Sequence, residues 1–85
     1  MKEFAYTITD PVGIHARPAG LLIKDMAKFS STTTISRGDD SCDGKKLLAL
    51  MKMRVKQGET IVVKAEGLDE DAAIESVKAF LSANL

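Results

Sequence analysis

The sequence predicts an α+β fold in which helices pack on one face of a mostly antiparallel sheet, within one domain spanning residues 1–85. Two observations predict this class. Segments with the two-residue alternation of strands are separated by segments with helical periodicity, in the order strand, helix, strand, strand, short helix, strand, helix. The two long helices each have an apolar stripe that must be covered, and a sheet provides the covering surface in a two-layer sandwich.

The first strand is predicted over residues 3–9, where apolar side chains alternate with smaller or polar ones. The Asp-Pro-Val-Gly run at 10–13 breaks this strand. A helix is predicted over residues 16–29, and Pro18 suits its first turn because the missing N–H costs nothing there. Gly20 is a weak point inside that helix. The apolar stripe consists of Ala19, Leu22, Ile23 and Met26.

The middle of the chain predicts two more strands and a short helix. Residues 32–37 are rich in β-branched side chains and predict the second strand. A turn at 38–40 and a short third strand near 41–43 are expected next. Residues 47–53 form a very apolar run between lysines, which predicts one or two helical turns.

The last third of the chain predicts one strand and one helix. A turn at 57–59 leads into a clear strand over residues 60–66, which Gly67 ends. Asp69 is then expected to cap the last helix. The apolar stripe of this helix consists of Ala73, Ile74, Val77, Phe80 and Leu81.

Composition excludes several classes of function. Twelve basic and twelve acidic residues cancel, so the charge gives no indication of nucleic-acid binding. The single cysteine, Cys42, excludes an intramolecular disulfide and a four-cysteine zinc site. With one histidine as well, no metal and no cofactor are expected. No apolar leader and no run of about 18 apolar residues is present, so we expect a cytoplasmic protein without membrane insertion.

The most informative stretch is Gly-Ile-His-Ala-Arg-Pro-Ala at residues 13–19, which places the only histidine, His15, at a strand-to-helix junction. An unperturbed imidazole is largely neutral at pH 7 and offers a lone pair. The first N–H groups of a helix lack partners and favour phosphate, and Arg17 adds donors matched to phosphate oxygens. His15 is therefore predicted to be a phosphorylatable nucleophile. The alternative is that His15 only caps the helix or lies on the surface.

This seven-residue motif resembles the active-site motif of HPr, the histidine-containing phosphocarrier protein of the phosphoenolpyruvate:sugar phosphotransferase system. The chain length, the position of the motif and the order of elements are similar as well, so the resemblance covers essentially the whole chain. It implies an open-faced β-sandwich of βαββαβα order with a four-stranded sheet.

The resemblance also implies a mechanism. His15 would accept a phosphoryl group on Nδ1 from enzyme I, which draws on phosphoenolpyruvate, and pass it to a sugar-specific IIA domain. Arg17 would stabilise the phosphate, with the backbone N–H groups of Ala16 and Arg17 facing it. The protein would be a monomeric, stoichiometric carrier rather than an enzyme that turns over alone.

One departure from the family concerns regulation. Many Gram-positive HPr proteins carry a regulatory serine at the start of the short second helix. An ungapped count from His15 places Lys46 at that position. We therefore expect no phosphorylation by HPr kinase here. Lys46 is also a poor helix N-cap, which Asp43 could offset if the helix begins earlier.

Residues 44–58 carry five positive charges and no negative ones. This run is either a solvated face or a docking surface that steers acidic partners; a membrane-surface helix is disfavoured because the run is short. The resemblance implies docking to enzyme I and IIA domains. The candidate docking residues are Leu47, Leu48, Met51, Lys24, Lys46 and Lys52. An alternative function is a regulatory module that binds enzymes or transcription factors and signals by its phosphorylation state.

Overall fold

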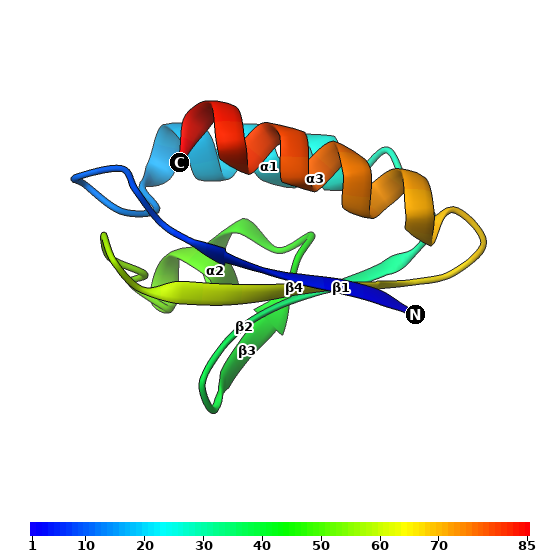
Figure 1. Ribbon diagram of the computed structural model, residues 1–85, viewed down its shortest axis with the longest axis horizontal. Helices are drawn as coiled ribbons and strands as arrows, with labels where there is room; N and C mark the ends of the chain where they lie inside the picture. The colour runs from blue at the N-terminus through cyan, green and yellow to red at the C-terminus, as the bar shows by residue number, and fades with distance from the viewer.

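The computed structural model describes residues 1–85 and contains seven elements in the predicted order (Figure 1). They are β1 (Lys2–Thr7), α1 (Ala16–Met26), β2 (Thr32–Arg37), β3 (Asp40–Asp43), α2 (Leu47–Lys52), β4 (Thr60–Glu66) and α3 (Glu70–Asn84). Helices α1 and α3 lie together on one face of the sheet. The shorter α2 packs against α1 and β3. The predicted fold class is confirmed. None of the helices has the length and apolar character that crossing a membrane requires.

The sheet has four strands in the order β1-β4-β2-β3, and every neighbouring pair is antiparallel. The sequence predicted a mostly antiparallel sheet, and the structure makes it wholly so. Strands β2 and β3 form a hairpin, whereas α1 connects β1 to β2 and α3 follows β4. Because β4 lies between β1 and β2, residues far apart in the chain meet along the centre of the sheet.

The core lies between the sheet and the two long helices. Strand β4 alternates between buried and more exposed residues, with Ile61, Val63 and Ala65 buried. The predicted helical stripes are confirmed, with Ile23 and Phe80 partly buried at the edge of the core. Full burial of a large aliphatic side chain contributes about 1.5–3 kcal/mol. The buried helical residues are Ala19, Leu22, Met26, Ala73, Ile74, Val77 and Leu81.

The first strand ends before the predicted residue 9. Strand β1 stops at Thr7, and the N–H groups of Thr9 and Asp10 donate instead to the main-chain oxygen of Leu85 at 2.6 and 3.0 Å. The Thr9 hydroxyl donates to the same oxygen at 2.9 Å. Thr9 and Asp10 are thus held by the end of α3 rather than by a neighbouring strand.

Helix α1 also ends earlier than predicted, at Met26 instead of residue 29. After Met26 the backbone hydrogen bonds join residues three apart instead of four. The Lys28 N–H donates to the Asp25 carbonyl at 3.3 Å, and the Phe29 N–H donates to the Met26 carbonyl at 3.1 Å. Such bonds between residues three apart commonly tighten the last turn of a helix. The apolar pattern continues through this turn, which is why periodicity extended the helix too far.

The predicted capping role of Asp69 is wrong. Asp69 occupies the N-cap position of α3, but its side chain makes no capping hydrogen bond. Its carboxylate accepts hydrogen bonds from the N–H groups of Ser30 and Ser31, at 2.8 and 2.9 Å, and from the Ser31 hydroxyl. It therefore joins the loop after α1 to the start of α3.

Asp69→Asn should lower the free energy of unfolding of the domain at neutral pH. The free energy of unfolding of the variant should also fall less than that of the wild type as the pH is lowered. Donors from Ser31 and Ser30 lower the pKa of Asp69. A lowered pKa contributes stability above about pH 4, the ordinary value, which disappears as the pH falls through the folded-state pKa. Urea unfolding at a series of pH values should therefore show the variant and the wild type converging below about pH 4. An equal difference between them at all pH values would contradict this role.

Gly20→Ala should stabilise the domain by up to about 1 kcal/mol, because alanine restricts the unfolded chain and favours the helix. A Cβ atom at this position would meet no atom within 4 Å. Thermal unfolding should show a higher midpoint. An unchanged or lower midpoint would show that the glycine has a packing role that the backbone does not reveal.

Candidate functional site

His15 is the N-cap residue of α1. Its backbone is extended, with φ −127° and ψ 173°, and its carbonyl accepts the Ala19 N–H at 2.9 Å. The side chain makes no capping hydrogen bond and is 40% exposed. The backbone of His15 therefore begins the helix while the imidazole is left accessible, which argues against a capping role for the ring.

The first turn of α1 presents free donors beside this ring. The N–H groups of Ala16 and Arg17 have no acceptor within the protein, and Pro18 has no N–H. The Arg17 side chain is exposed and forms no ion pair or hydrogen bond. A helix N-terminus with unpaired N–H groups attracts an anion. The arrangement can hold a phosphate next to His15.

The loop before His15 is held by the segment that follows α2. Gly13 has a φ of +78°, and its N–H donates to the Asp10 carbonyl at 2.9 Å. The Ile14 N–H donates to the Val55 carbonyl at 3.0 Å. A Cβ atom on Gly13 would lie 2.4 Å from that same oxygen. Gly13 is thus required both for the left-handed backbone and for this close approach.

His15 lines a hollow of about 370 Å³ at the junction of these segments. Arg54 and Lys56 lie on its wall, and neither side chain has an acidic partner. Arg54 is the one non-glycine residue with positive φ, at 51°, a conformation that costs roughly 1–2 kcal/mol. The remaining lining residues are Val12, Ile14, Met51 and Val55. The hollow is therefore basic and partly apolar.

Sequence reasoning missed Asp10, which it treated only as a strand breaker. The Asp10 Oδ2 atom lies 3.6 Å from Nε2 of His15, an ion-pair distance. Its Oδ1 atom accepts the Val12 N–H at 2.8 Å. An aspartate that accepts from the N–H two residues on is a recognised turn pattern. The Asp-Pro-Val-Gly run therefore contained a signal for the turn, although not for its contact with His15.

Of the three predicted apolar docking residues, only Met51 is at the His15 hollow. Met51 lines it, whereas Leu47 and Leu48 are 38% and 76% exposed on α2. Two of the exposed apolar residues that sequence reasoning did not select are Val12, in the loop before His15, and Leu21, on α1. Val12 lines the His15 hollow, whereas Leu21 lines a separate hollow between α1 and α3, together with Lys24 and Phe80.

The predicted basic docking residues are separated by the fold. Lys24 is exposed on α1, and Lys46 is the exposed N-cap of α2, with no side-chain hydrogen bond. The helix does not begin earlier, so Asp43 does not offset this poor cap: its Oδ1 accepts the Lys45 N–H at 2.8 Å and its carbonyl accepts the Lys46 N–H at 3.1 Å, both before Leu47. Lys52 does not line the His15 hollow.

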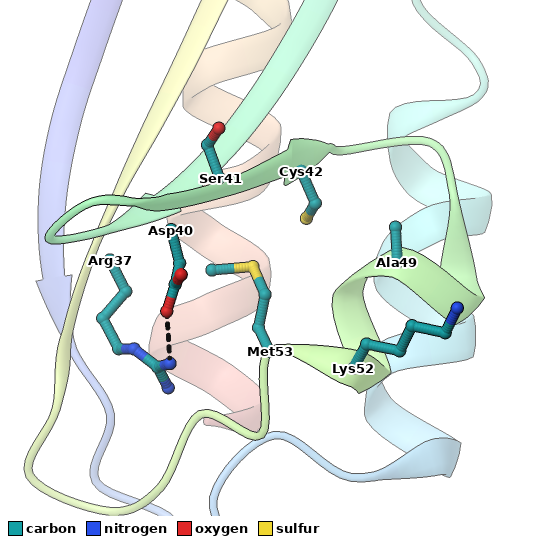
Figure 2. Close-up of a pocket in the computed structure, with 7 residues that line it drawn as sticks. All are labelled: Arg37, Asp40, Ser41, Cys42, Ala49, Lys52 and Met53. Carbon is teal, nitrogen blue, oxygen red and sulfur yellow. Dashed lines mark hydrogen bonds and ion pairs between the residues drawn. The ribbon is translucent and has the colours of Figure 1, made fainter.

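Lys52 borders a second hollow, of about 340 Å³, between β3 and α2 (Figure 2). Arg37 pairs with Asp40 there at 3.0 Å, drawn as a dashed line. Cys42 is half-buried, and burial followed by the charge of Asp43 raises its thiol pKa. The reactive thiolate of Cys42 is therefore disfavoured. The other lining residues are Ser41, Ala49 and Met53.

Comparison with known proteins gives a consistent result. A family described as the PTS HPr component phosphorylation site matches residues 2–83. The chain is 42% identical over 78 residues to phosphocarrier protein HPr of Mycoplasma capricolum, covering 92% of this chain and 88% of that protein. It is 38% identical to phosphocarrier protein HPr of Mycoplasma genitalium, covering 99% and 97% of the two chains.

Solved structures show the same likeness. A histidine-containing phosphocarrier protein of Mycoplasma superposes with a TM-score of 0.94 at 39% identity, covering 96% of this chain and 93% of that one. HPr of Thermoanaerobacter tengcongensis has a TM-score of 0.93 at 32% identity, covering 98% and 93%. A dimer of HPr from the latter organism also matches, with a TM-score of 0.78, so the monomeric state expected here stays a prediction. This chain belongs to the HPr family, the phosphocarrier proteins of the phosphotransferase system.

Proposed function

We propose that His15 is the residue on which this phosphocarrier carries its phosphoryl group, received from enzyme I and passed to sugar-specific IIA domains. The observation that carries the proposal is the accessible, non-capping imidazole of His15 beside the unpaired N–H groups of Ala16 and Arg17. The family and the position of the motif support it, and no other histidine exists in the chain.

The chemistry asks mainly for positioning and for stabilisation of negative charge. The lone pair of a His15 ring nitrogen attacks phosphorus, and the bond between phosphorus and the donor breaks, leaving its electron pair with the donor. The N–H groups of Ala16 and Arg17 and the guanidinium of Arg17 are the groups available to bind the phosphoryl oxygens. Transfer to a IIA domain is the same step in reverse, so the protein acts as a stoichiometric carrier and needs no cofactor.

Partner docking would use the surface around the His15 hollow. Met51, Leu47 and Leu48 offer apolar contact on α2, Lys46 is the exposed N-cap of that helix, and Lys24 is exposed on α1. Charges at the edge of an interface act mainly on the rate of encounter. We therefore propose that the apolar residues contribute to the affinity for the partner and that the lysines raise the rate of association with it. Lys52 would contribute only from the neighbouring hollow.

The test of the proposed function is incubation with enzyme I, magnesium and phosphoenolpyruvate labelled on phosphorus. The wild type should take up about one phosphoryl group per chain, in an acid-labile and base-stable form, and lose it when a IIA domain is added. Absence of label, or label that survives acid, would refute the assignment of a phosphohistidine carrier.

Lys46 leads to a separate prediction about regulation. A lysine has no hydroxyl to accept a phosphoryl group, so HPr kinase with ATP should leave the wild type unmodified. Lys46→Ser should restore a hydroxyl at the exposed N-cap of α2 and also improve the cap by about 0.5–2 kcal/mol. Intact-mass measurement checks the first point and thermal unfolding the second. Phosphoserine in the wild type would show that the site lies elsewhere.

A further inference from the structure

We propose that Asp10 is a positioning residue for phosphoryl transfer, which selects the reactive nitrogen of His15 and balances the charge that forms on the ring. This inference deepens the proposed function and rests on it. Its starting observation is the 3.6 Å distance between the Asp10 carboxylate and Nε2 of His15. No other carboxylate of the chain forms an ion pair with the imidazole.

The carboxylate of Asp10 is firmly placed. Its Oδ1 accepts the Val12 N–H at 2.8 Å, which leaves Oδ2 directed at the ring. The backbone of Asp10 is held on both sides, because its N–H donates to Leu85 at 3.0 Å and its carbonyl accepts the Gly13 N–H at 2.9 Å. The side chain is 24% exposed, so its charge is less screened than that of a free surface residue. A group held in this way can orient a neighbour at little entropic cost.

A carboxylate facing Nε2 determines which nitrogen reacts. In a neutral imidazole one nitrogen carries the proton and the other carries the lone pair, and the hydrogen-bond partner of one nitrogen decides between the two forms. Asp10 accepts but cannot donate, so it favours the proton on Nε2. The lone pair then lies on Nδ1, which becomes the nucleophile. The distance of 3.6 Å is longer than a hydrogen bond, as is common before substrate binds.

The same carboxylate stabilises the product of the transfer. When the Nδ1 lone pair forms the bond to phosphorus, the ring keeps its Nε2 proton and gains a positive charge. No proton leaves, and the donor retains the electron pair of the broken bond. Asp10 therefore faces a cationic ring after transfer and a neutral ring before it. Since this attraction is stronger in the transition state than in the ground state, it lowers the barrier.

The test uses two variants and one control. Asp10→Asn keeps an oxygen that can accept the Val12 N–H but removes the charge. Asp10→Ser keeps an oxygen that can form the turn, but the serine side chain is too short for this oxygen to reach the His15 ring. Asp39→Asn removes a carboxylate from the exposed turn between β2 and β3, where it forms no ion pair, and matches the change in net charge.

Two measurements are made on each protein. Nitrogen NMR of the neutral His15 ring should show the Nε2-protonated form as dominant in the wild type and in Asp39→Asn, and reduced in both Asp10 variants. Phosphoryl transfer from enzyme I should show the kcat of enzyme I lowered about two- to fivefold when an Asp10 variant is the acceptor, the effect of a partly exposed ion pair, with KM unchanged.

Wild-type tautomer ratios in the folded Asp10 variants would overturn the proposal. So would an unchanged kcat with a raised KM, since that result would place Asp10 in partner docking instead. The NMR measurement needs no phosphoryl donor, so it tests Asp10 even if the wild type failed to accept a phosphoryl group. That failure would refute the proposed function and the transfer part of this inference, whereas a normal wild type with unaltered variants would refute the role of Asp10 alone.

Discussion

His15→Ala should abolish phosphoryl acceptance while leaving the domain folded. The imidazole is the only histidine side chain in the sequence, so no second ring can replace it as an acceptor. Its side chain makes no capping bond and is 40% exposed, so the fold loses little when it is removed. The expected result is loss of all acid-labile label, with a thermal midpoint close to that of the wild type.

Arg17→Ala is the matched comparison for this prediction. Arg17 lies on the same turn, is exposed and pairs with no acidic group, so its loss should also spare the fold. If it binds phosphoryl oxygens, the variant should still be labelled, but more slowly, by roughly one to three powers of ten for one lost charged donor. Label remaining on His15→Ala would remove His15 from the mechanism, and an unaffected Arg17→Ala would remove Arg17.

Gly13→Ala should have the largest effect on structure of any substitution near the site. A Cβ atom there would lie 2.4 Å from the Val55 carbonyl oxygen and 2.8 Å from the Lys56 Cα, and neither backbone atom can move aside as a flexible side chain would. The positive φ of 78° adds roughly 1–2 kcal/mol of strain. The total cost in the free energy of unfolding should exceed about 2 kcal/mol.

Gly58→Ala separates the cost of the positive φ from the cost of the close approach to Val55 and Lys56. Gly58 has a similar φ of +86°, but a Cβ atom there would meet nothing within 4 Å. It should therefore cost only the conformational term, and it should leave phosphoryl transfer nearly unchanged. Gly13→Ala should also slow transfer, because the segment that carries His15 must separate from Val55. Equal losses in urea unfolding for the two variants would show that close packing at Gly13 is unimportant.

Much of this architecture was predictable because it depends on neighbours in the chain. The β-branched run at Thr32–Arg37 and the alternation at Thr60–Glu66 gave the bounds of β2 and β4 correctly. The apolar stripes of α1 and α3 identified the core residues of both helices. Helices and strands each have a fixed period, so a buried face requires apolar residues at regular spacing in the sequence. The prediction failed where the apolar spacing continued past the end of the helix, as at residues 27–29, which follow α1.

The role of Asp69 shows a second kind of failure. An aspartate before a helix usually caps it, and position alone predicted that here. The structure instead directs the carboxylate toward Ser30 and Ser31, which are distant in sequence. A hydrogen bond to a distant loop competes with the local cap and leaves no trace in the residue pattern around Asp69.

The sequence by itself determined that His15 stands at the start of a helix, followed by Arg17 and preceded by a glycine turn, because all of these are relations between adjacent residues. Only the tertiary structure decided what faces the ring. It placed Asp10 at 3.6 Å from Nε2 and set Met51 and Arg54 on the wall of the same hollow. Those contacts depend on how α1, α2 and the loop before α1 pack together. Packing is governed by the shapes and burial of many side chains at once, and no local pattern encodes it.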